Sequence, residues 1–398
     1  MIPTLNLLYI GNWALSDPLT QATVFPHLEL LLESSRVEKL VFLTIERKDM
    51  DDQDYAILRH PKIIYRPLLS AMSSGILGRV NDLIRFPVAV RRLIKEHQVD
   101  KVIARGAPAG GVVSSVCVLD KVPFYVESFE PHADYMVESG VWTRFELKTI
   151  IERIWEKRIK RKAAGIMPVA ENYKKRLVQE GLQEDRIVTV PCGVKISNFR
   201  FNADDRARTR QSLSLPENAF VGVYVGKFGG NYYEEEAFQL FQKIFGVADT
   251  HLVILSPDTE EKIRTSIKKF GLPGDRIRIL SVKHHEVPSY LSASDYAFAL
   301  PKPSPSKLFL SLVKIGEYWA NGLPVIVTTG IGDDAEHIRK LGIGFELPEH
   351  WKELPLSYFS EQMDLIRGLT DREKILKEAE TRRSFQISKS AYEYFQLI

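Results

Sequence analysis

The sequence predicts an α/β protein built from two doubly wound, largely parallel sheets. Short apolar runs rich in β-branched residues alternate with helical patterns, and this alternation is typical of βαβ units. The alternation is interrupted by a polar segment at residues 202–217 and then restarts. At 398 residues the chain is longer than one hydrophobic core usually serves, so about two domains are expected.

The first domain is expected to hold seven strands with helices between several of them. The apolar runs lie at residues 5–10, 39–45, 62–66, 101–104, 123–126, 165–169 and 186–190. Helical patterns occur at residues 23–34 and 80–95. The polar segment 202–217, which carries charges of both signs, is interpreted as the linker.

The second domain is expected to hold six strands and to be followed by one further helix. Its apolar runs lie at residues 220–226, 251–256, 276–282, 296–300, 323–327 and 343–347. Residues 374–389 are strongly helical, and no strand follows them. We therefore expect domains at 1–201 and 202–372 and a helix within 373–398 that packs back towards the first domain. Because ligands of such sheets bind at the carboxyl ends of the strands, the expected site is a cleft that the two domains face.

Bulk composition excludes several classes of protein. The 54 basic and 51 acidic residues leave a net charge of +3, which gives no argument for nucleic-acid binding. No apolar stretch has the length of about 18 residues that a membrane span needs, and the amino terminus lacks a basic signal segment. Cys117 and Cys192 have no CxxC partner. We expect a cytoplasmic protein whose cysteines are reduced.

The segment from Ser311 to Asp333 is the most informative part of the chain. It reads as a helix with Ser311 as N-cap and Asn321-Gly322 at its end, followed by a buried strand. Lys314 is unusual there, because the amino end of a helix already carries positive partial charge. A bound anion such as phosphate would explain this lysine. Glu317 lies on the same helix face and could accept hydrogen bonds from sugar hydroxyls. The alternative interpretation is a surface ion pair between Lys314 and Glu317.

A second candidate segment follows the strand at 220–226. Lys227 is followed by Gly229 and Gly230, and such glycines let backbone N–H groups approach an anion closely. The spacing fits neither a Walker loop nor a dinucleotide-binding fingerprint. Together Lys227 and Lys314 would stabilise the charge on a departing nucleoside diphosphate. The alternative is an ordinary glycine turn with a solvated lysine.

Polar residues also follow strands of the first domain. Glu130 and His132 come after the strand at 123–126, where His132 could hydrogen-bond a hydroxyl group. Gly11 and Arg105 occupy equivalent strand-end positions. We interpret this group as a sugar or acceptor site. The alternative is a capping loop in which His132 is structural.

No metal site is predicted. The pairs Asp49/Asp51 and Asp52/Asp54 both spell D-x-D, but a solvated acidic loop is the favoured interpretation. The adjacent histidines at 284 and 285 would point away from each other, which is poor ligand geometry.

Residues 146–162 are expected to form a basic amphipathic helix, and the segment 144–162 holds eight basic and three acidic residues. One interpretation is peripheral contact with an anionic membrane at the inner face of the plasma membrane, where lipid-linked acceptors are found. The other is a solvated helix face.

Over nearly its whole length the chain resembles the retaining family-4 GT-B glycosyltransferases, in particular bacterial members that build surface polysaccharides. The most specific segment is 314–333; the others are 11–19, 127–136, 190–199, 224–233 and 284–295. The resemblance implies the GT-B architecture of two Rossmann-like domains. It also implies transfer of a sugar, with retention, from a UDP-, GDP- or dTDP-linked donor to a glycan or lipid-linked acceptor, without a metal cofactor.

The resemblance also assigns roles to residues. Lys227 and Lys314 correspond to the basic pair on the donor diphosphate, and Glu317 corresponds to the second glutamate of E-x7-E, which binds the ribose. Backbone amides of Ser311, Leu312 and Val313 would face the phosphates, and Val282 and Lys283 would contact the base. His132 maps near the transferred sugar, and Gly11 maps to the glycine loop facing the diphosphate.

Two departures from the family pattern keep other functions open. Phe309 replaces the first glutamate of the motif, and Tyr232 lies where a second basic residue is usual. One alternative is a nucleotide-sugar epimerase on the same fold. Another is a non-catalytic nucleotide-binding subunit.

Overall fold

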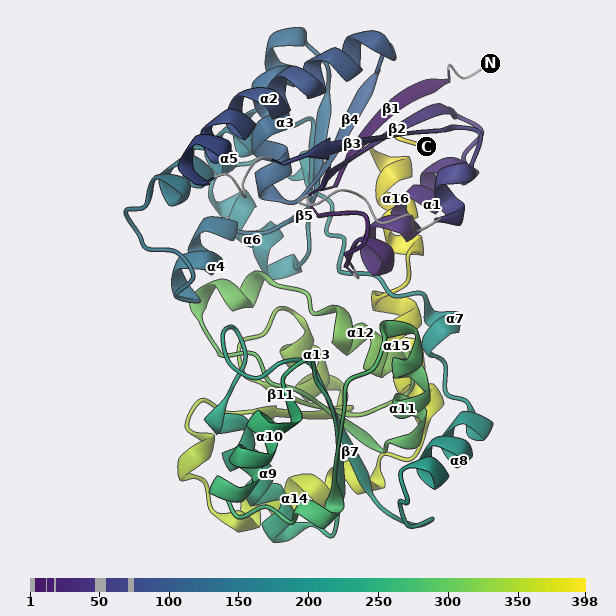
Figure 1. The fold of residues 1–398 in the computed structure, drawn as a ribbon, viewed down its shortest axis with the longest axis vertical. Helices are drawn as coiled ribbons and strands as arrows, with labels where there is room; N and C mark the ends of the chain where they lie inside the picture. The colour runs from purple at the N-terminus through teal and green to yellow at the C-terminus, as the bar shows by residue number, and fades with distance from the viewer. Residues whose placement is uncertain (1–3, 12, 18, 47–54, 71–74) are drawn as a thin grey trace. The chain divides into compact units, whose positions relative to one another are not determined.

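The computed structural model describes residues 4–11, 13–17, 19–46, 55–70 and 75–398, without the side chains of 75–81 and 83. By internal contacts the chain divides into two compact units. The amino-terminal unit comprises Met1–Gly193 and Phe385–Ile398, and the carboxy-terminal unit comprises Val194–Ser384. The expected α/β class and the two parallel sheets are confirmed, with one six-stranded sheet in each unit (Figure 1).

The sheet of the amino-terminal unit is parallel throughout, with strand order β3-β2-β1-β4-β5-β6. Its strands are β1 (Leu5–Ile10), β2 (Val37–Glu46), β3 (Ile63–Leu69), β4 (Lys101–Arg105), β5 (Phe124–Phe129) and β6 (Gly165–Pro168). Its α-helices are α1 (Phe25–Glu33), α2 (Gly75–Glu96), α3 (Ala107–Asp120), α4 (His132–Glu138), α5 (Leu147–Lys162), α6 (Glu171–Gln179) and α16 (Gln386–Tyr394). The chain enters α1 through a short π-helix, Thr20–Val24.

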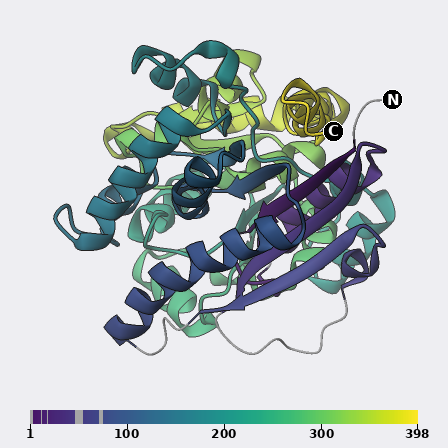
Figure 2. The ribbon, with the colours of Figure 1, turned by 90° about the horizontal axis from the view of Figure 1, so that it is seen from above.

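Helices cover both faces of this sheet. Leu7 and Tyr9 of β1 pack in one core cluster with Leu28 of α1 and Tyr392 of α16. The carboxy-terminal helix, yellow in Figure 2, lies beside the purple amino-terminal strands. Helices α3 and α5 pack together on the opposite face, where Gly110 approaches Ile159 of α5.

The sheet of the carboxy-terminal unit is also parallel, with strand order β12-β11-β10-β7-β8-β9. Its strands are β7 (Val221–Val225), β8 (His251–Leu255), β9 (Ile277–Leu280), β10 (Tyr296–Ala299), β11 (Val325–Thr328) and β12 (Gly344–Leu347). Its α-helices are α7 (Ile196–Phe199), α8 (Ala203–Ser212), α9 (Glu235–Val247), α10 (Glu260–Lys269), α11 (Val287–Ala293), α12 (Val313–Ala320), α13 (Asp334–Leu341), α14 (Leu356–Gly368) and α15 (Arg372–Arg382).

Two apolar layers enclose this second sheet. Tyr224 of β7 and Phe298 of β10 pack on one face with α9, α10 and α14. Val223 of β7 and Val325 of β11 pack on the other face with α11, α12, α13 and α15. Alternate strand residues therefore face the two layers, and the carboxyl ends of the strands are left to carry loops.

Three expectations about the elements are wrong. Residues 186–190 do not form a strand: they have one isolated bridge, Ile166 to Ile187, and a backbone hydrogen bond from Val190 to Pro168, so the first sheet has six strands rather than seven. The expected linker 202–217 contains helix α8, which Asn202 caps through its side chain. The expected helix at 374–389 is broken into α15 and α16, and the two belong to different units.

Candidate functional site

A glycine loop follows β7 at the carboxyl end of the second sheet. Gly226, Gly229 and Gly230 have φ values of 138°, 82° and 61°, a range that side-chain-bearing residues adopt only with strain. Tyr224 of strand β7 fixes the start of the loop, because its hydroxyl group donates to the Lys227 carbonyl at 2.6 Å. These glycines allow a tight path that a chain with β-carbons would not follow.

Lysine and aspartate side chains hold the same loop from neighbouring elements. The Phe228 N–H donates to the Asp258 carboxylate at 2.7 Å. The ammonium group of Lys307, which is buried, donates to the Asn231 carbonyl at 3.0 Å. The loop is thus fixed at both ends, as a preorganised binding loop requires.

Lys314 lies directly against this loop. It is the second residue of α12, and its Nζ donates to the Val225 carbonyl at 2.7 Å. The same Nζ lies 4.2 Å from the centroid of the Tyr232 ring, a cation–π contact. A β-carbon on Gly226 would lie 2.8 Å from this Nζ. The lysine predicted from the helix pattern therefore contacts the glycine loop predicted from the strand end.

Lys227 is part of the loop itself. Its side chain is exposed, and its Nζ lies 3.8 Å from the position that a β-carbon on Gly230 would take. Lys227 and Lys314 are thus brought to the same short segment, 226–232. The contact of each with a diphosphate stays a prediction.

Glu317 lies one turn along α12 from Lys314, and it is almost fully buried. Its Oε1 is 2.7 Å from His284 Nε2. This hydrogen bond raises the pKa of His284, although partial burial opposes the shift. Glu317 is therefore paired with a histidine and Lys314 with a carbonyl and a ring, so the described contacts do not support the alternative of a surface Lys314–Glu317 ion pair.

The predicted base-contacting residues immediately precede this histidine. Val282 is half-buried and Lys283 is exposed at the carboxyl end of β9. The Lys283 N–H donates to the Glu286 carboxylate at 2.8 Å, which fixes the start of the turn. His284 thereby links the predicted base-contacting turn to the predicted ribose-binding carboxylate.

The amino end of α12 differs from the expectation in one respect. Ser311 is not the N-cap: Leu312 occupies that position with extended backbone, and no side chain caps the helix. The Ser311 hydroxyl instead accepts a hydrogen bond from Arg383. Leu312 and Val313 are half-buried. The predicted role of the amides of 311–313 on phosphate is untested, while the predicted end of the helix at Asn321, with Gly322 at φ 75°, is confirmed.

In the amino-terminal unit, His132 begins helix α4 among carboxyl groups. Its Nδ1 lies 3.4 Å from Glu130 Oε1. Burial lowers the pKa of His132, but Glu130, Glu152 and Glu156 outweigh burial and raise it overall. Burial also raises the pKa of Glu152 and of Glu156 to about 7. This cluster can exchange protons near neutral pH, and its predicted contact with a sugar is untested.

Arg105 and Gly11, the other residues predicted at strand ends of this unit, are both buried. Arg105 is 4% exposed and pairs with Glu127 at 2.7 Å. The Gly11 N–H donates to the Leu43 carbonyl at 2.9 Å, so Gly11 continues the pairing of β1 with β2. These contacts give both residues structural roles, and neither predicted donor contact is tested.

Sequence reasoning missed three residues of the carboxy-terminal site. In the sequence, His284 is visible only as a poor metal ligand and as part of the segment 284–295, Lys307 has no assigned role, and Tyr232 marks the absence of a basic residue. Each acts through a partner distant in sequence; Glu317, for example, lies 33 positions after His284. Local periodicity gives no signal for such pairs.

Within the described part of the chain, no group of three or more histidine, cysteine or carboxylate side chains is placed to hold a metal ion. The D-x-D pairs at 49–54 lie outside the described residues. None of the described helices is both long enough and apolar enough to cross a bilayer.

Comparison with known proteins finds solved structures of the same fold and one partial sequence match. No family model matches the chain. A curated relative from Bacillus subtilis (strain 168), provisionally named the teichuronic acid biosynthesis glycosyltransferase TuaC, is 24% identical over 252 residues. That match spans 61% of this chain and 57% of the relative, less than two thirds of its length.

Solved structures match along the whole chain at low identity. HepE from Anabaena in complex with UDP has a TM-score of 0.71 and 14% identity, over 99% of this chain and 100% of that chain. A further HepE structure holds UDP-glucose. A structure from Listeria monocytogenes, provisionally named UDP-N-acetylglucosamine 2-epimerase, has a TM-score of 0.65 and 12% identity, over 99% and 98% of the two chains. The expected GT-B fold is confirmed, and membership of the retaining family 4 stays a prediction.

Proposed function

We propose that the chain is a glycosyltransferase whose carboxy-terminal unit binds a nucleotide-sugar donor. The observation that carries the proposal is the contact of Lys314 with the glycine loop that bears Lys227, with Glu317 one turn further along the same helix. Fold neighbours that hold UDP and UDP-glucose support the donor class. The name of the partial relative supports transfer in surface-polysaccharide synthesis.

The proposed chemistry is electrostatic. As the bond between the sugar and the diphosphate breaks, negative charge accumulates on the leaving phosphate. Lys227 and Lys314 would stabilise that charge, and donors fixed in advance are the most effective because they need no reorganisation. The resemblance to retaining family-4 enzymes supports retention at the anomeric carbon and a mechanism that needs no metal ion.

Glu317 would bind the donor ribose. His284 occupies Oε1 and orients the carboxylate, while Oε2 accepts no hydrogen bond that is recorded from the described residues. A carboxylate held in this way accepts strongly from a hydroxyl group. In the amino-terminal unit, His132 is proposed to bond a hydroxyl of the transferred sugar. The proposed acceptor is a glycan or lipid-linked sugar.

A thermal-shift screen with UDP-, GDP- and dTDP-sugars, each with and without a chelator, tests the donor class. A ligand present at a hundred times its Kd stabilises the native state by about 2.7 kcal/mol. We expect one nucleotide class to raise the melting temperature, with the same shift after chelation. If no nucleotide-sugar shifts the transition, the proposed donor site is wrong; if chelation abolishes the shift, binding depends on a metal.

An epimerase is the second candidate, because a structure of the same fold carries that name. Incubation with the nucleotide-sugar alone separates the two, since an epimerase converts it without an acceptor. A third candidate is a non-catalytic nucleotide-binding subunit, because Phe309 stands at the position of the missing glutamate. Such a subunit would give the thermal shift but neither transfer nor release of the nucleoside diphosphate.

Tyr232 is predicted to position Lys314 through its ring. Tyr232→Ala removes the cation–π contact, which is worth about 0.5–2 kcal/mol, so we expect turnover to fall about tenfold. Tyr232→Phe keeps the ring and should retain near-normal turnover. The comparison is made by steady-state release of the nucleoside diphosphate; equal losses in the two variants would instead assign the effect to the hydroxyl group.

A further inference from the structure

Helix α5 buries two carboxyl groups in the amino-terminal unit. Glu152 and Glu156 are four residues apart, so they share one face of the helix, and they are only 3% and 7% exposed. A glutamate is rarely buried to this extent without a partner of opposite charge, because its charged form loses the solvation that water provides. For neither residue is an ion pair with a described residue recorded. Their burial therefore requires another explanation.

Glu156 contacts the start of helix α4. Its Oε1 accepts a hydrogen bond from the Ala133 N–H at 2.9 Å. Ala133 directly follows His132, the first residue of α4, so Glu156 fixes the backbone that carries this histidine. Glu152 Oε1 is also buried, and it has no hydrogen-bond partner among the described residues. One glutamate thus holds the helix in place, and the other keeps an oxygen without a partner.

Both glutamates also act on the His132 imidazole. Burial opposes protonation of the ring, but the carboxyl groups of Glu130, Glu152 and Glu156 outweigh burial and raise the pKa of His132. Glu130 belongs to the loop before α4, whereas Glu152 and Glu156 belong to α5. Carboxylates close to an imidazole favour its protonated form. The histidine is therefore acted on by carboxyl groups from two separate parts of the chain.

Aromatic rings complete the surroundings of His132. The Trp142 ring meets the imidazole edge-on, with the two centroids 5.5 Å apart. The Tyr135 ring, on α4 itself, has its centroid 6.5 Å from that of the imidazole. The Lys148 ammonium group lies 5.3 Å from the Trp142 centroid and pairs with Glu146 at 2.7 Å. The rings limit the positions that the imidazole can adopt, so packing as well as charge sets its direction.

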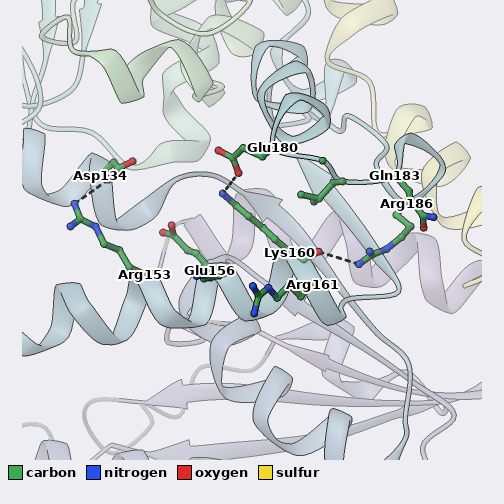
Figure 3. A pocket seen from close by; sticks show the side chains of 11 residues that line it. Asp134, Arg153, Glu156, Lys160, Arg161, Glu180, Gln183 and Arg186 are labelled. Atoms are coloured by element: carbon green, nitrogen blue, oxygen red, sulfur yellow. Dashed lines mark hydrogen bonds and ion pairs between the residues drawn. The ribbon is translucent and has the colours of Figure 1, made fainter.

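Glu156 also lines an open pocket of about 730 Å³ in the same unit (Figure 3). Arg153, which precedes Glu156 on α5, pairs with Asp134 at 3.3 Å. Lys160, which follows Glu156, pairs with Glu180 at 2.6 Å. The dashed lines in Figure 3 mark both pairs, which occupy the cations on either side of Glu156 along the helix. Because the pocket gives Glu156 contact with water, this carboxyl group can exchange a proton with solvent.

The protonation of His132 decides what its second ring nitrogen can do. Nδ1 lies 3.4 Å from Glu130, and no hydrogen bond of Nε2 with a described residue is recorded. The side chain is 23% exposed, so part of the ring can meet a ligand. A neutral ring that donates from Nδ1 to Glu130 can only accept at Nε2, whereas the protonated ring donates from both nitrogens. Carboxyl groups that retain the proton therefore make Nε2 a donor.

We propose that Glu152 and Glu156 are positioning residues that keep the His132 ring protonated on both nitrogens, so that Nε2–H donates a hydrogen bond to an oxygen of the bound sugar. The inference rests on the proposed contact of His132 with that sugar. Glu156 sets the direction of the ring through Ala133, and Glu152 contributes charge. Burial raises the pKa of both glutamates to about 7. Their negative charge thus develops where an isolated histidine becomes neutral, and it retains the proton on the ring.

Titration of the His132 ring by NMR in the full chain tests the charge. Histidine is isotope-labelled, and the His132 signal is assigned by its loss in His132→Gln. Glu152→Gln and Glu156→Gln keep the size of the side chain and an acceptor oxygen, but they cannot ionise. We expect the titration midpoint of His132 to fall by about one pH unit in each variant, because a neighbouring negative charge is lost. The falling alkaline limb of kcat/KM against pH should move by the same amount, since this limb reports protonation of the free enzyme.

Glu156→Ala tests the direction of the ring separately from its charge. It removes the acceptor for the Ala133 N–H, so turnover should fall about tenfold or more at every pH, as it does when a binding group is misplaced. Glu156→Gln keeps that acceptor and should retain near-normal turnover below about pH 6, where the ring stays protonated without help.

Glu33 provides a matched control. It is exposed at the end of α1, which packs on the other face of the sheet from α5. Glu33→Gln removes one carboxylate from the same unit and should change neither the His132 titration nor turnover.

An unchanged His132 midpoint in both glutamine variants overturns the proposal, and so does wild-type turnover in Glu156→Ala. A midpoint that moves while the activity profile stays in place also overturns it, because the charge then serves no ligand. The thermal shift with nucleotide-sugar should be the same in every variant, so failure here leaves the donor proposal intact. If no nucleotide-sugar shifts the transition, the donor proposal fails, and the titration still decides whether the glutamates hold the proton on His132.

Discussion

Replacing Lys314 with methionine is expected to lower turnover about a hundredfold, the loss typical of removing one preorganised hydrogen-bond donor to a transition state. Methionine keeps a long apolar stem against the Tyr232 ring but removes the ammonium group that donates to the Val225 carbonyl. The fold should persist, because Lys314 is only half-buried. Steady-state release of nucleoside diphosphate measures the effect, and the decrease should appear mainly in kcat.

Lys268 provides a matched control. It is exposed near the end of α10, so Lys268→Met removes one positive charge from the same unit at a position outside the segment 226–232. This variant should keep wild-type turnover. Near-normal kcat in Lys314→Met, or an equal loss in Lys268→Met, would contradict the assignment of Lys314 to the leaving phosphate.

Most of the fold was predictable because a strand buried on both faces is apolar throughout. Tyr296–Ala299 and Val325–Thr328 are wholly buried; the first lies within the predicted run 296–300 and the second overlaps the predicted run 323–327. Residues 186–190 have a similar composition but lie beside the edge strand β6 and pair with it only through one bridge and one further backbone hydrogen bond. Composition indicates that a segment is apolar and extended; it does not indicate whether a neighbour completes the ladder.

The two wrong helix assignments have a tertiary cause. Helix α8 is highly polar, and long-range ion pairs of Arg206 and Arg210 with Asp295 hold it. The break between α15 and α16 follows Arg383, which is buried and bonded to Asp334 and Ser311. Local sequence patterns carry no information about contacts over such separations. The sequence therefore predicts a linker where the polar helix α8 lies, and one continuous helix where α15 and α16 are separate.

The candidate site was predictable to the extent that local electrostatics specified it. Lys314 stood out because a helix amino terminus disfavours a cation, and Glu317 followed from helix periodicity. What the sequence could not supply was the set of supporting contacts. His284 orients Glu317, Tyr232 lies against Lys314, and Lys307 holds the glycine loop, all through side chains that meet only after folding.

A buried network in the amino-terminal unit also consists of side chains that are far apart in the sequence and meet only after folding. The Glu127 carboxylate accepts hydrogen bonds from the hydroxyl groups of Tyr9 and Tyr392, and it pairs with Arg105. Burial would raise the pKa of Glu127, but His27, Arg105 and the two hydroxyl groups together lower it below its usual value. Because Tyr392 belongs to α16, this carboxylate ties the last helix of the chain to strands β1, β4 and β5.

Replacing Glu127 with leucine is therefore expected to destabilise the amino-terminal unit by about 3–5 kcal/mol, because Arg105 is left as an uncompensated buried charge. Thermal unfolding of the full chain, with hydrogen exchange to assign the transition to this unit, measures the loss. Glu361→Gln, an exposed carboxylate on α14, should leave both units unchanged. The double variant Glu127→Leu/Arg105→Met removes both charges and should recover part of the loss. If the double variant is less stable than Glu127→Leu, the hydrogen bonds to the tyrosines rather than the charge pair dominate, and the electrostatic account of this network is wrong.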